Sequence, residues 1–358
     1  MREPSTKLHN ALYFMSGMMV VILALVIVAG VKTKAENAGF HIAEDTENSY
    51  EQQVAGQTDT TQDSGQEKWQ EGVVAYQGKE YLYNTDIKTY LMRGVDINGP
   101  VQQSSDYTQG GQSDALFLLV VNNKTQQLQV ISINRNTMTD IELCDEDGID
   151  MGPLKTQICL QHAFGDGKRL SCSKTVDAVS GLFQNIPISG YLAMNMGGIP
   201  QMNDAVGGVE VTVLQDISFP KAGVDLKKGK KVTLDGTQAY YYLHGRDTEE
   251  YDSATKRLQR EEQYIVAYMD KLKKVSTENP DQVTEIYNSV SDYLVTSVDF
   301  TSMIEQLMNY SFSEDQMYTV PGKTVEGKPI DGKRYEEYHV DEDAMEELIM
   351  KVFYTPVQ

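Results

Sequence analysis

The chain has 358 residues, of which 52 are acidic and 31 are lysine or arginine, so its formal charge is −21 at neutral pH. A surface of that sign repels polyanions, and no basic element suited to reading DNA is visible, which excludes nucleic acid as an expected partner. After an N-terminal apolar segment, the chain is long enough for one sizeable domain.

The apolar segment spans residues 12–31 and contains no charged side chain. About 20 such residues match the hydrocarbon core of a bilayer, so we expect a transmembrane anchor behind a short cytoplasmic tail at residues 1–11. A cleaved signal peptide is the competing interpretation, because both begin with a short basic segment. With so short a tail, the large C-terminal part is expected outside the cytoplasm, held at the cell membrane by a single pass.

The next segment, residues 32–68, is rich in Glu, Gln, Asp, Thr, Ser and Gly and nearly lacks large apolar side chains. Such a composition cannot bury enough surface to offset the entropy lost on ordering, so we predict a flexible stalk. Residues 69–358 contain no second linker and are predicted to form one extracytoplasmic domain.

Strand patterns open this domain. A small hairpin is predicted from residues 73–76 and 80–83. Residues 115–121 form a continuous apolar run of strand length, which is typical of a strand buried on both faces. After a turn, a second strand is expected at residues 128–133. Antiparallel pairing of these two strands would bring Asp114, at the start of one, near Arg135, just after the other.

Three cysteines follow these strands: Cys144, Cys159 and Cys172. Outside the cytoplasm an odd number allows one disulfide and one free thiol, and three buried reduced thiols are the alternative. Their spacing selects no pair and does not resemble a zinc site.

Further along, helical and strand patterns mix. We predict a helix at 173–183, a strand at 209–213, and a helix within the acidic segment 331–347. The three tyrosines at 240–242 are predicted as a strand edge, in preference to a sugar-stacking platform. The mixture predicts an α/β fold with a central mixed β-sheet flanked by helices. The chain has no Gly-x-Ser-x-Gly elbow and no complete Gly-x-x-x-x-Gly-Lys-Ser/Thr loop, so a serine hydrolase and a P-loop enzyme are not supported.

A long helix is predicted at residues 252–275, where Arg257, Arg260 and Tyr264 share one face. An apolar stripe beside that face would dock the helix against the core. Guanidinium groups match phosphate oxygens bidentately, so we interpret the face as a phosphate or pyrophosphate grip. A solvated helix face paired with neighbouring glutamates is the alternative.

Together, several short segments resemble the LytR-CpsA-Psr family of bacterial envelope phosphotransferases. In chain order they are Gly94-Val95-Asp96, Ser113-Asp114, Ile133-Asn134-Arg135-Asn136-Thr137, residues 203–209, residues 234–239, and Arg246 through Glu261.

The resemblance implies an enzyme that transfers a glycopolymer, of teichoic acid or capsule type, from a polyprenyl-pyrophosphate carrier to a peptidoglycan sugar. Its partners would be the lipid-linked polymer, peptidoglycan and the membrane. Asp96 and Asp114 match positions that hold a divalent metal, Mg²⁺ or alternatively Mn²⁺, and with Arg135 they are the expected catalytic residues. Either aspartate is a candidate general base. The prenyl tail would occupy an apolar tunnel beneath the sheet. The expected pyrophosphate-binding side chains are Arg135, Arg246, Arg257, Arg260, His244 and Glu261.

The chain departs from the family pattern at several site positions. Many members have Arg where Gln112 stands, and most have Asp, Arg and Gln at the positions of Asn136, His244 and Glu261. The exchanges at Gln112, His244 and Glu261 make the site less positive. A non-catalytic binder of lipid-linked polyprenyl phosphates is therefore the alternative to an active transferase, and a structural protein whose arginines form internal salt bridges is a third hypothesis.

Overall fold

The computed structural model describes residues 72–245, 251–279, 282–298, 310–312, 314–328 and 335–357. The predicted tail, anchor and stalk lie outside this part, as does Arg246. No helix within the described residues is long and apolar enough to cross a membrane.

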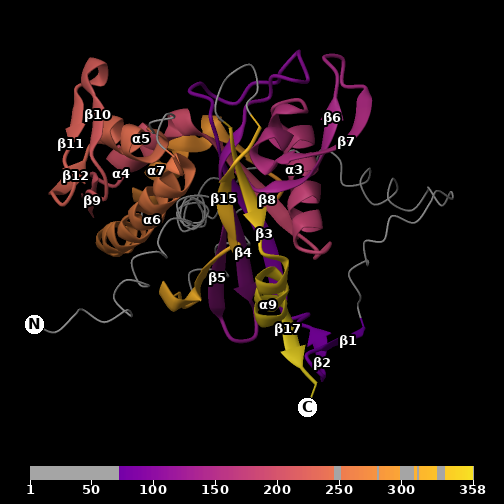
Figure 1. Cartoon of the computed structure of the whole chain (residues 1–358). Helices are drawn as coiled ribbons and strands as arrows, with labels where there is room; N and C mark the ends of the chain where they lie inside the picture. Colours follow the sequence, from indigo (N-terminus) through magenta and orange to yellow (C-terminus); the bar gives the residue numbers. More distant parts are fainter. Residues whose placement is uncertain are drawn as a thin grey trace, which may run out of the picture.

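The architecture is built on a six-stranded mixed sheet with the strand order β13-β8-β3-β4-β5-β14 (Figure 1). Neighbouring pairs β3–β8 and β5–β14 are parallel, and the other three pairs are antiparallel. The strands are β3 (Ile87–Val95), β4 (Ser113–Asn122), β5 (Gln127–Ile133), β8 (Gly190–Asn195), β13 (Leu294–Thr296) and β14 (Met317–Thr319).

The central strand β4 is buried on both faces, as its apolar run predicts. Its alternate side chains belong to two different cores: Phe117 faces one and Leu116 the other. Leu116 pairs with Ile133 of β5, which confirms the predicted antiparallel hairpin. The side chains of one strand thus tie together both layers that cover the sheet.

Helices cover both faces of the sheet, which confirms the predicted α/β class with a central mixed sheet (Figure 1). The first face carries α4 (Ile199–Ala205), α5 (Gly236–His244), α6 (Ser253–Glu278) and α7 (Gln282–Val290). Two antiparallel strand pairs extend this layer: β9 (Val209–Thr212) with β12 (Lys231–Leu234), and β10 (Ile217–Phe219) with β11 (Val224–Leu226). The opposite face carries α3 (Arg169–Leu182) and α9 (Glu342–Phe353).

Smaller elements complete the described part of the chain. The predicted N-terminal hairpin is present and pairs further with the C-terminal strand. These elements are β1 (Val73–Tyr76), β2 (Lys79–Tyr83), β17 (Tyr354–Pro356), β6 (Met138–Cys144), β7 (Asp150–Gln157), β15 (Gly322–Glu326) and β16 (Glu336–Val340), with 3-10 turns η1 (Ile158–Ala163), η2 (Met196–Gly198), η3 (Pro220–Ala222), η4 (Ser291–Tyr293) and η5 (Glu314–Gln316).

The structure corrects one prediction from the sequence and decides between two alternatives for another. The tyrosines at 240–242 lie in helix α5, so the predicted strand edge is wrong. A capping box between Asp235 and Gln238 starts that helix, and it outweighs the strand preference of three tyrosines. All three cysteines are buried free thiols, which selects the reduced alternative.

Candidate active site

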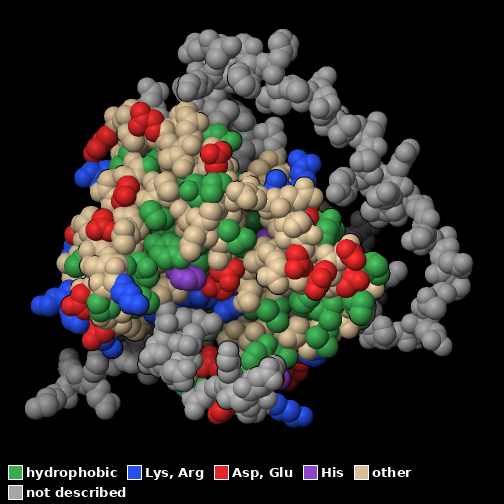
Figure 2. Space-filling view, turned by 90° about the horizontal axis from the view of Figure 1, so that it is seen from above, with side chains coloured by type: hydrophobic (Ala, Val, Ile, Leu, Met, Phe, Trp, Pro, Cys, Tyr) green, Lys and Arg blue, Asp and Glu red, His purple; other side chains and the backbone are tan. Residues whose placement is uncertain are grey.

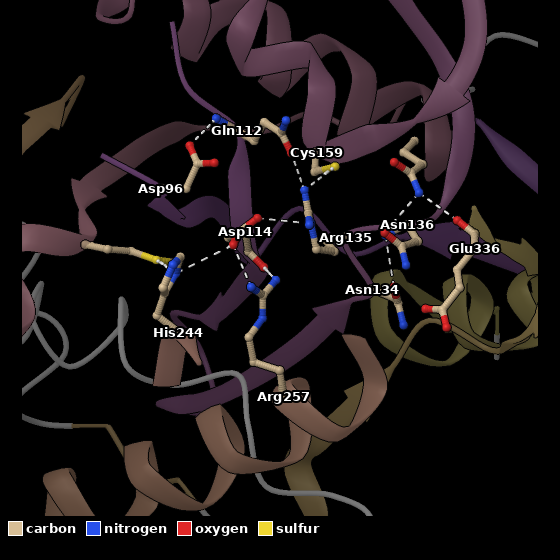
Figure 3. Close-up of polar contacts among 12 residues, drawn as sticks. Asp96, Gln112, Asp114, Asn134, Arg135, Asn136, Cys159, His244, Arg257 and Glu336 are labelled. Atoms are coloured by element: carbon tan, nitrogen blue, oxygen red, sulfur yellow. Dashed lines mark hydrogen bonds and ion pairs between the residues drawn. The ribbon is translucent and has the colours of Figure 1, made fainter. Parts of the chain in front are cut away.

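Strand ends meet at one edge of the central sheet and bring three predicted site residues together. Val95, the last residue of β3, pairs with Ser113, the first residue of β4. Asp96 therefore emerges beside Asp114, and Arg135 follows the end of the neighbouring strand β5. Figure 3 shows the side chains of Asp96, Asp114 and Arg135 in one cluster.

Asp114 is the centre of this cluster (Figure 3). Its Oδ1 forms an ion pair with Arg135 Nε at 3.0 Å, and Arg257 Nη1 of α6 donates to Oδ2 at 2.5 Å. Arg257 Nη2 also donates to the Asp114 carbonyl oxygen at 3.0 Å. Asp114 is only 7% exposed, and burial disfavours its charge, but Arg257 and then Arg135 outweigh burial and hold its pKa well below the usual range. The carboxylate is therefore a fixed anion that links both sheet strands to α6.

Besides Asp114, Arg135 reaches two other groups. Its Nη2 donates to Gln112 Oε1 and, at 3.1 Å, to the sulfur of Cys159. Nη1 has no hydrogen-bond partner among the described residues. One edge of this guanidinium thus remains available to a ligand.

Asp96 differs from Asp114 in its surroundings, because its side chain is exposed. Its Oδ1 accepts a hydrogen bond from the Gln112 backbone at 2.6 Å, and no partner for Oδ2 is found in the described part of the chain. Partial burial raises its pKa, with the hydrogen bond from Gln112 opposing the shift. The neighbouring charge of Asp114 raises this pKa further, so the two carboxylates are close enough to interact.

Glu261 lies on α6 one turn after Arg257 and is 3% exposed. Its Oε1 is 3.5 Å from Arg257 Nε, and its Oε2 is buried without a hydrogen-bond partner. Burial raises the pKa of Glu261 to about 8, although Arg257 opposes the shift. The carboxyl group is therefore mainly protonated at neutral pH, and it does not place a negative charge beside a bound phosphate.

His244, at the end of α5, is also at the edge of the cluster. Its Nδ1 is 3.8 Å from Asp114 Oδ2 and 3.1 Å from the sulfur of Met196. The side chain is 34% exposed, so it can be reached from solvent. A neutral imidazole supplies a weaker phosphate contact than an arginine at this position would supply.

Two other predicted side chains lie away from Asp114. Arg260 donates to the carbonyl oxygens of Tyr242, at 2.6 Å, and Gly245, and at 2.8 Å to Gln215. Arg260 thus donates to carbonyl oxygens at the C-terminal end of α5, which have no partner within the helix. These contacts do not support the predicted role in pyrophosphate binding. Asn136 accepts from Gln157 at 3.1 Å and does not contact Asp114. Its exchange therefore leaves the charge of the cluster unchanged.

The apolar cavity beside Glu261 is small. Its volume is about 20 Å³, which suits roughly one water-sized group. It is lined by Gly94, Ala115, Phe117, Met194, Met196, Ile199, Leu243 and Glu261. This cavity by itself is too small to hold a prenyl tail. A wider cleft of about 600 Å³ between β6, α3 and α9 contains none of the predicted site residues.

Two contacts around the cluster were not predicted from the sequence. Cys159 supports Arg135 from η1, a segment without helical or strand periodicity. Tyr240 lies against His244, which only the helical spacing of residues 240 and 244 would have indicated.

The two carboxylates fit a Mg²⁺ ion held in the way usual for phosphate substrates, by one or two carboxylates together with phosphate and water. Asp96 offers Oδ2, and each oxygen of Asp114 keeps a lone pair beyond its guanidinium contact. No group of three or more His, Cys, Asp or Glu suited to a metal occurs in the described part of the chain. The remaining ligands would therefore come from substrate and solvent.

Comparison with known proteins identifies the family. The model of the LytR_cpsA_psr family matches residues 42–352. The chain belongs to the LytR-CpsA-Psr family. This confirms the resemblance drawn from the short motifs around Asp96, Asp114 and Arg135.

Curated members of the family are named for their activity. The chain is 30% identical over 231 residues to the polyisoprenyl-teichoic acid–peptidoglycan teichoic acid transferase TagU of Enterococcus faecalis, covering 64% of this chain and 67% of that protein. It is 32% identical over 161 residues to a protein of the same name from Halalkalibacterium halodurans, covering 45% of each. The chain thus spans about two thirds of the first relative and under half of the second.

Solved structures of the family share the fold. A Bacillus subtilis TagV structure has a TM-score of 0.57 at 21% identity, covering 75% of this chain and 96% of that one. The protein gbs0355 of Streptococcus agalactiae gives 0.57 at 20% identity, covering 75% and 87%. A structure described as TagT bound to LI-WTA gives 0.52 at 20% identity, covering 75% and 90%. At these identities the likeness concerns the fold.

Proposed function

We propose that the protein transfers a glycopolymer, of teichoic acid or capsule type, from a polyprenyl-pyrophosphate carrier to a peptidoglycan sugar. The observation that carries this proposal is the convergence of Asp96, Asp114, Arg135 and Arg257 at one sheet edge. Family relatives named as teichoic acid transferases support the substrate class. The predicted anchor at residues 12–31 would hold the site near the membrane that contains the lipid carrier.

The donor class follows from where the reaction takes place. No ATP is supplied outside the cell, so a transferase there needs a donor that carries its own activated bond. A lipid pyrophosphate does so, and phosphoryl transfer asks the protein mainly for positioning and charge stabilisation.

The charge of the cluster supports a metal requirement. Two carboxylates, Asp96 and Asp114, offset two guanidiniums, Arg135 and Arg257, while Glu261 is protonated at neutral pH. The described side chains therefore supply little net positive charge for a dianionic pyrophosphate. A Mg²⁺ ion on Asp96 and Asp114 would supply that charge and polarise the phosphoryl oxygens.

The remaining steps can be assigned to side chains of this chain. Both Asp114 oxygens face guanidiniums, whereas Asp96 is exposed. We therefore assign Asp96 Oδ1, which keeps a lone pair beyond the hydrogen bond from Gln112, as the general base for the acceptor hydroxyl, while Oδ2 would hold the metal. The hydroxyl oxygen bonds to the phosphorus next to the glycan, its proton passes to Asp96, and the bond to the bridging oxygen breaks. Arg135 Nη1 is the open donor that would stabilise the departing prenyl phosphate.

A non-catalytic binder of lipid-linked polyprenyl phosphates is the second candidate. It is favoured by the state of Arg257, because each of its nitrogens already faces an oxygen of Asp114 or Glu261. The weak donor His244 adds to this argument. A binder would hold the lipid and leave its pyrophosphate intact.

Transfer itself separates the two candidates. The full chain in detergent would be mixed with a labelled polyprenyl-pyrophosphate saccharide, Mg²⁺ and a peptidoglycan acceptor. The proposal predicts a phosphodiester-linked product, release of prenyl phosphate, and loss of both in Asp96→Asn. Bound lipid with neither product nor release would establish the binder instead. An Asn279→Asp variant, changed at the exposed end of α6, is the control and should transfer the saccharide as wild type does.

A further inference from the structure

Four aromatic rings lie in a row beside the carboxylates, and the proposed transfer gives them no role. Phe219 and Tyr241 have centroids 4.6 Å apart, Tyr241 and Tyr240 are 5.2 Å apart, and Tyr240 and His244 are 5.2 Å apart. The row ends at His244, which is 3.8 Å from Asp114. It therefore runs from the β10–β11 hairpin to the reaction centre.

The row is held by a fixed helix. Residues 240 and 244 are one turn apart on α5, so their rings meet on one side of the helix. The capping box at Asp235 fixes the start of α5, and Arg260 binds carbonyls at its end. The rings consequently keep their positions without help from a ligand.

The four rings of the row are only partly buried, in contrast to their neighbour Tyr242. Tyr242 is fully buried. Its hydroxyl group donates a hydrogen bond to Gln263 Oε1 and accepts one from the backbone N–H of Leu214. Figure 2 shows hydrophobic, acidic, basic and histidine side chains next to one another on one face of the molecule. The row thus offers aromatic surface to solvent next to charged groups.

Polar groups suited to hydroxyls flank the row. The hydroxyl group of Tyr240 donates to Asn98 Oδ1 at 2.7 Å, and Asn98 is exposed two residues after Asp96. Its amide nitrogen and the carboxylate of Asp96 can both bind sugar hydroxyls. A prenyl chain would gain nothing from these groups, because burying unpaired polar atoms against it costs free energy.

We propose that the row Phe219, Tyr241, Tyr240 and His244 is a saccharide-binding track that guides a glycan to the reaction centre. Aromatic faces bind the apolar side of a sugar ring, while the amide and carboxylate bind its hydroxyls. The centroids of neighbouring rings are 4.6–5.2 Å apart, so the aromatic row is continuous. The inference rests on the proposed function for the identity of the glycan, which is either the acceptor or the donor polymer.

Binding of lipid-free saccharides tests the track. The full chain in detergent would be titrated with a peptidoglycan tetrasaccharide in one arm and with a lipid-free donor disaccharide phosphate in the other. Tyr240→Ala should lower the affinity for the saccharide that uses the track by roughly five- to tenfold, because stacking on this ring is lost. Tyr240→Phe keeps the ring and should stay within about twofold. Binding of polyprenyl phosphate should not change in either variant.

Tyr81→Ala provides the matched control, since Tyr81 is a partly buried tyrosine on β2 whose ring lies against that of Tyr76 in the β1–β2 hairpin. If Tyr240→Ala weakens binding of the peptidoglycan tetrasaccharide, the track binds the acceptor. If it weakens binding of the donor disaccharide phosphate, the track binds the donor. Equal affinities for wild type and Tyr240→Ala in both arms overturn the inference. Failure of transfer with Tyr240-dependent saccharide binding would instead count against the proposed function alone.

Discussion

Replacing Glu261 by Gln tests whether the carboxyl group beside Arg257 is protonated in the folded protein. Burial raises its pKa from 4.5 to about 8, so the folded state binds the proton more tightly than the unfolded state does. As the pH rises from 4.5 towards 8, the unfolded state loses its proton first, and this side chain makes folding progressively less favourable. Glutamine has a similar shape and carries no charge at any pH.

The magnitude follows from the shift. One pKa unit corresponds to about 1.4 kcal/mol, so the two pKa values imply a cost that grows by about 3 kcal/mol between pH 5 and pH 7.5. Urea unfolding of both proteins at each pH would give the difference in unfolding free energy. The unfolding free energy of Glu261→Gln minus that of wild type should rise by about 3 kcal/mol from pH 5 to pH 7.5. Contributions from other titrating groups are the same in both proteins and cancel in this difference.

Glu278→Gln, an exposed change at the end of the same helix, should show a difference near zero at both pH values. A constant difference for Glu261→Gln between pH 5 and pH 7.5 would refute the reasoning. It would mean that Arg257 keeps Glu261 ionised, and that the site carries one more negative charge than we infer.

Other changes test the remaining parts of the site. Asp114→Asn should lower the unfolding free energy in urea by about 3–5 kcal/mol, because two buried guanidiniums lose their partner; a loss below 1 kcal/mol would contradict the ion pairs. Arg260→Lys should lower the melting temperature while leaving pyrophosphate affinity within about twofold, and a tenfold weaker affinity would restore its predicted role. Asn136→Asp should change pyrophosphate affinity by less than about twofold, because its oxygen still accepts from Gln157. The thiols of Cys144, Cys159 and Cys172 should resist a thiol reagent until urea unfolds the protein, and fast labelling without urea would show that they are accessible.

The core of the site was predictable because it depends on strand pairing. The apolar run at 115–121 and the turn after it determine an antiparallel hairpin, and that hairpin places Asp114 beside Arg135. Asp96 joins them through the next strand pair. Local patterns of this kind determine how the strands pair. The pairing in turn determines where the backbone of each site residue lies and in which direction its side chain leaves the strand.

Other features depended on neighbours that the sequence does not reveal. Helical spacing puts Arg257 and Arg260 near each other, yet the carbonyls at the end of α5 attract Arg260 away from Asp114. The burial of Glu261, which decides its protonation, depends on β3, β4 and α5 packing around it. For α5 itself the signal was present: Asp235 and Gln238 form a capping box that the tyrosines at 240–242 obscured.

Paramagnetic broadening of phosphorus resonances tests the central claim most directly. The full chain would be loaded with a short-chain polyprenyl-pyrophosphate analogue, and Mn²⁺ would be added in place of Mg²⁺ while the ³¹P spectrum is recorded. If Asp96 and Asp114 hold a metal against a pyrophosphate bound by Arg135, Mn²⁺ broadens both phosphorus signals in wild type and not in Asp96→Asn. Equal broadening in both proteins, or none in wild type with the lipid bound, would contradict the account.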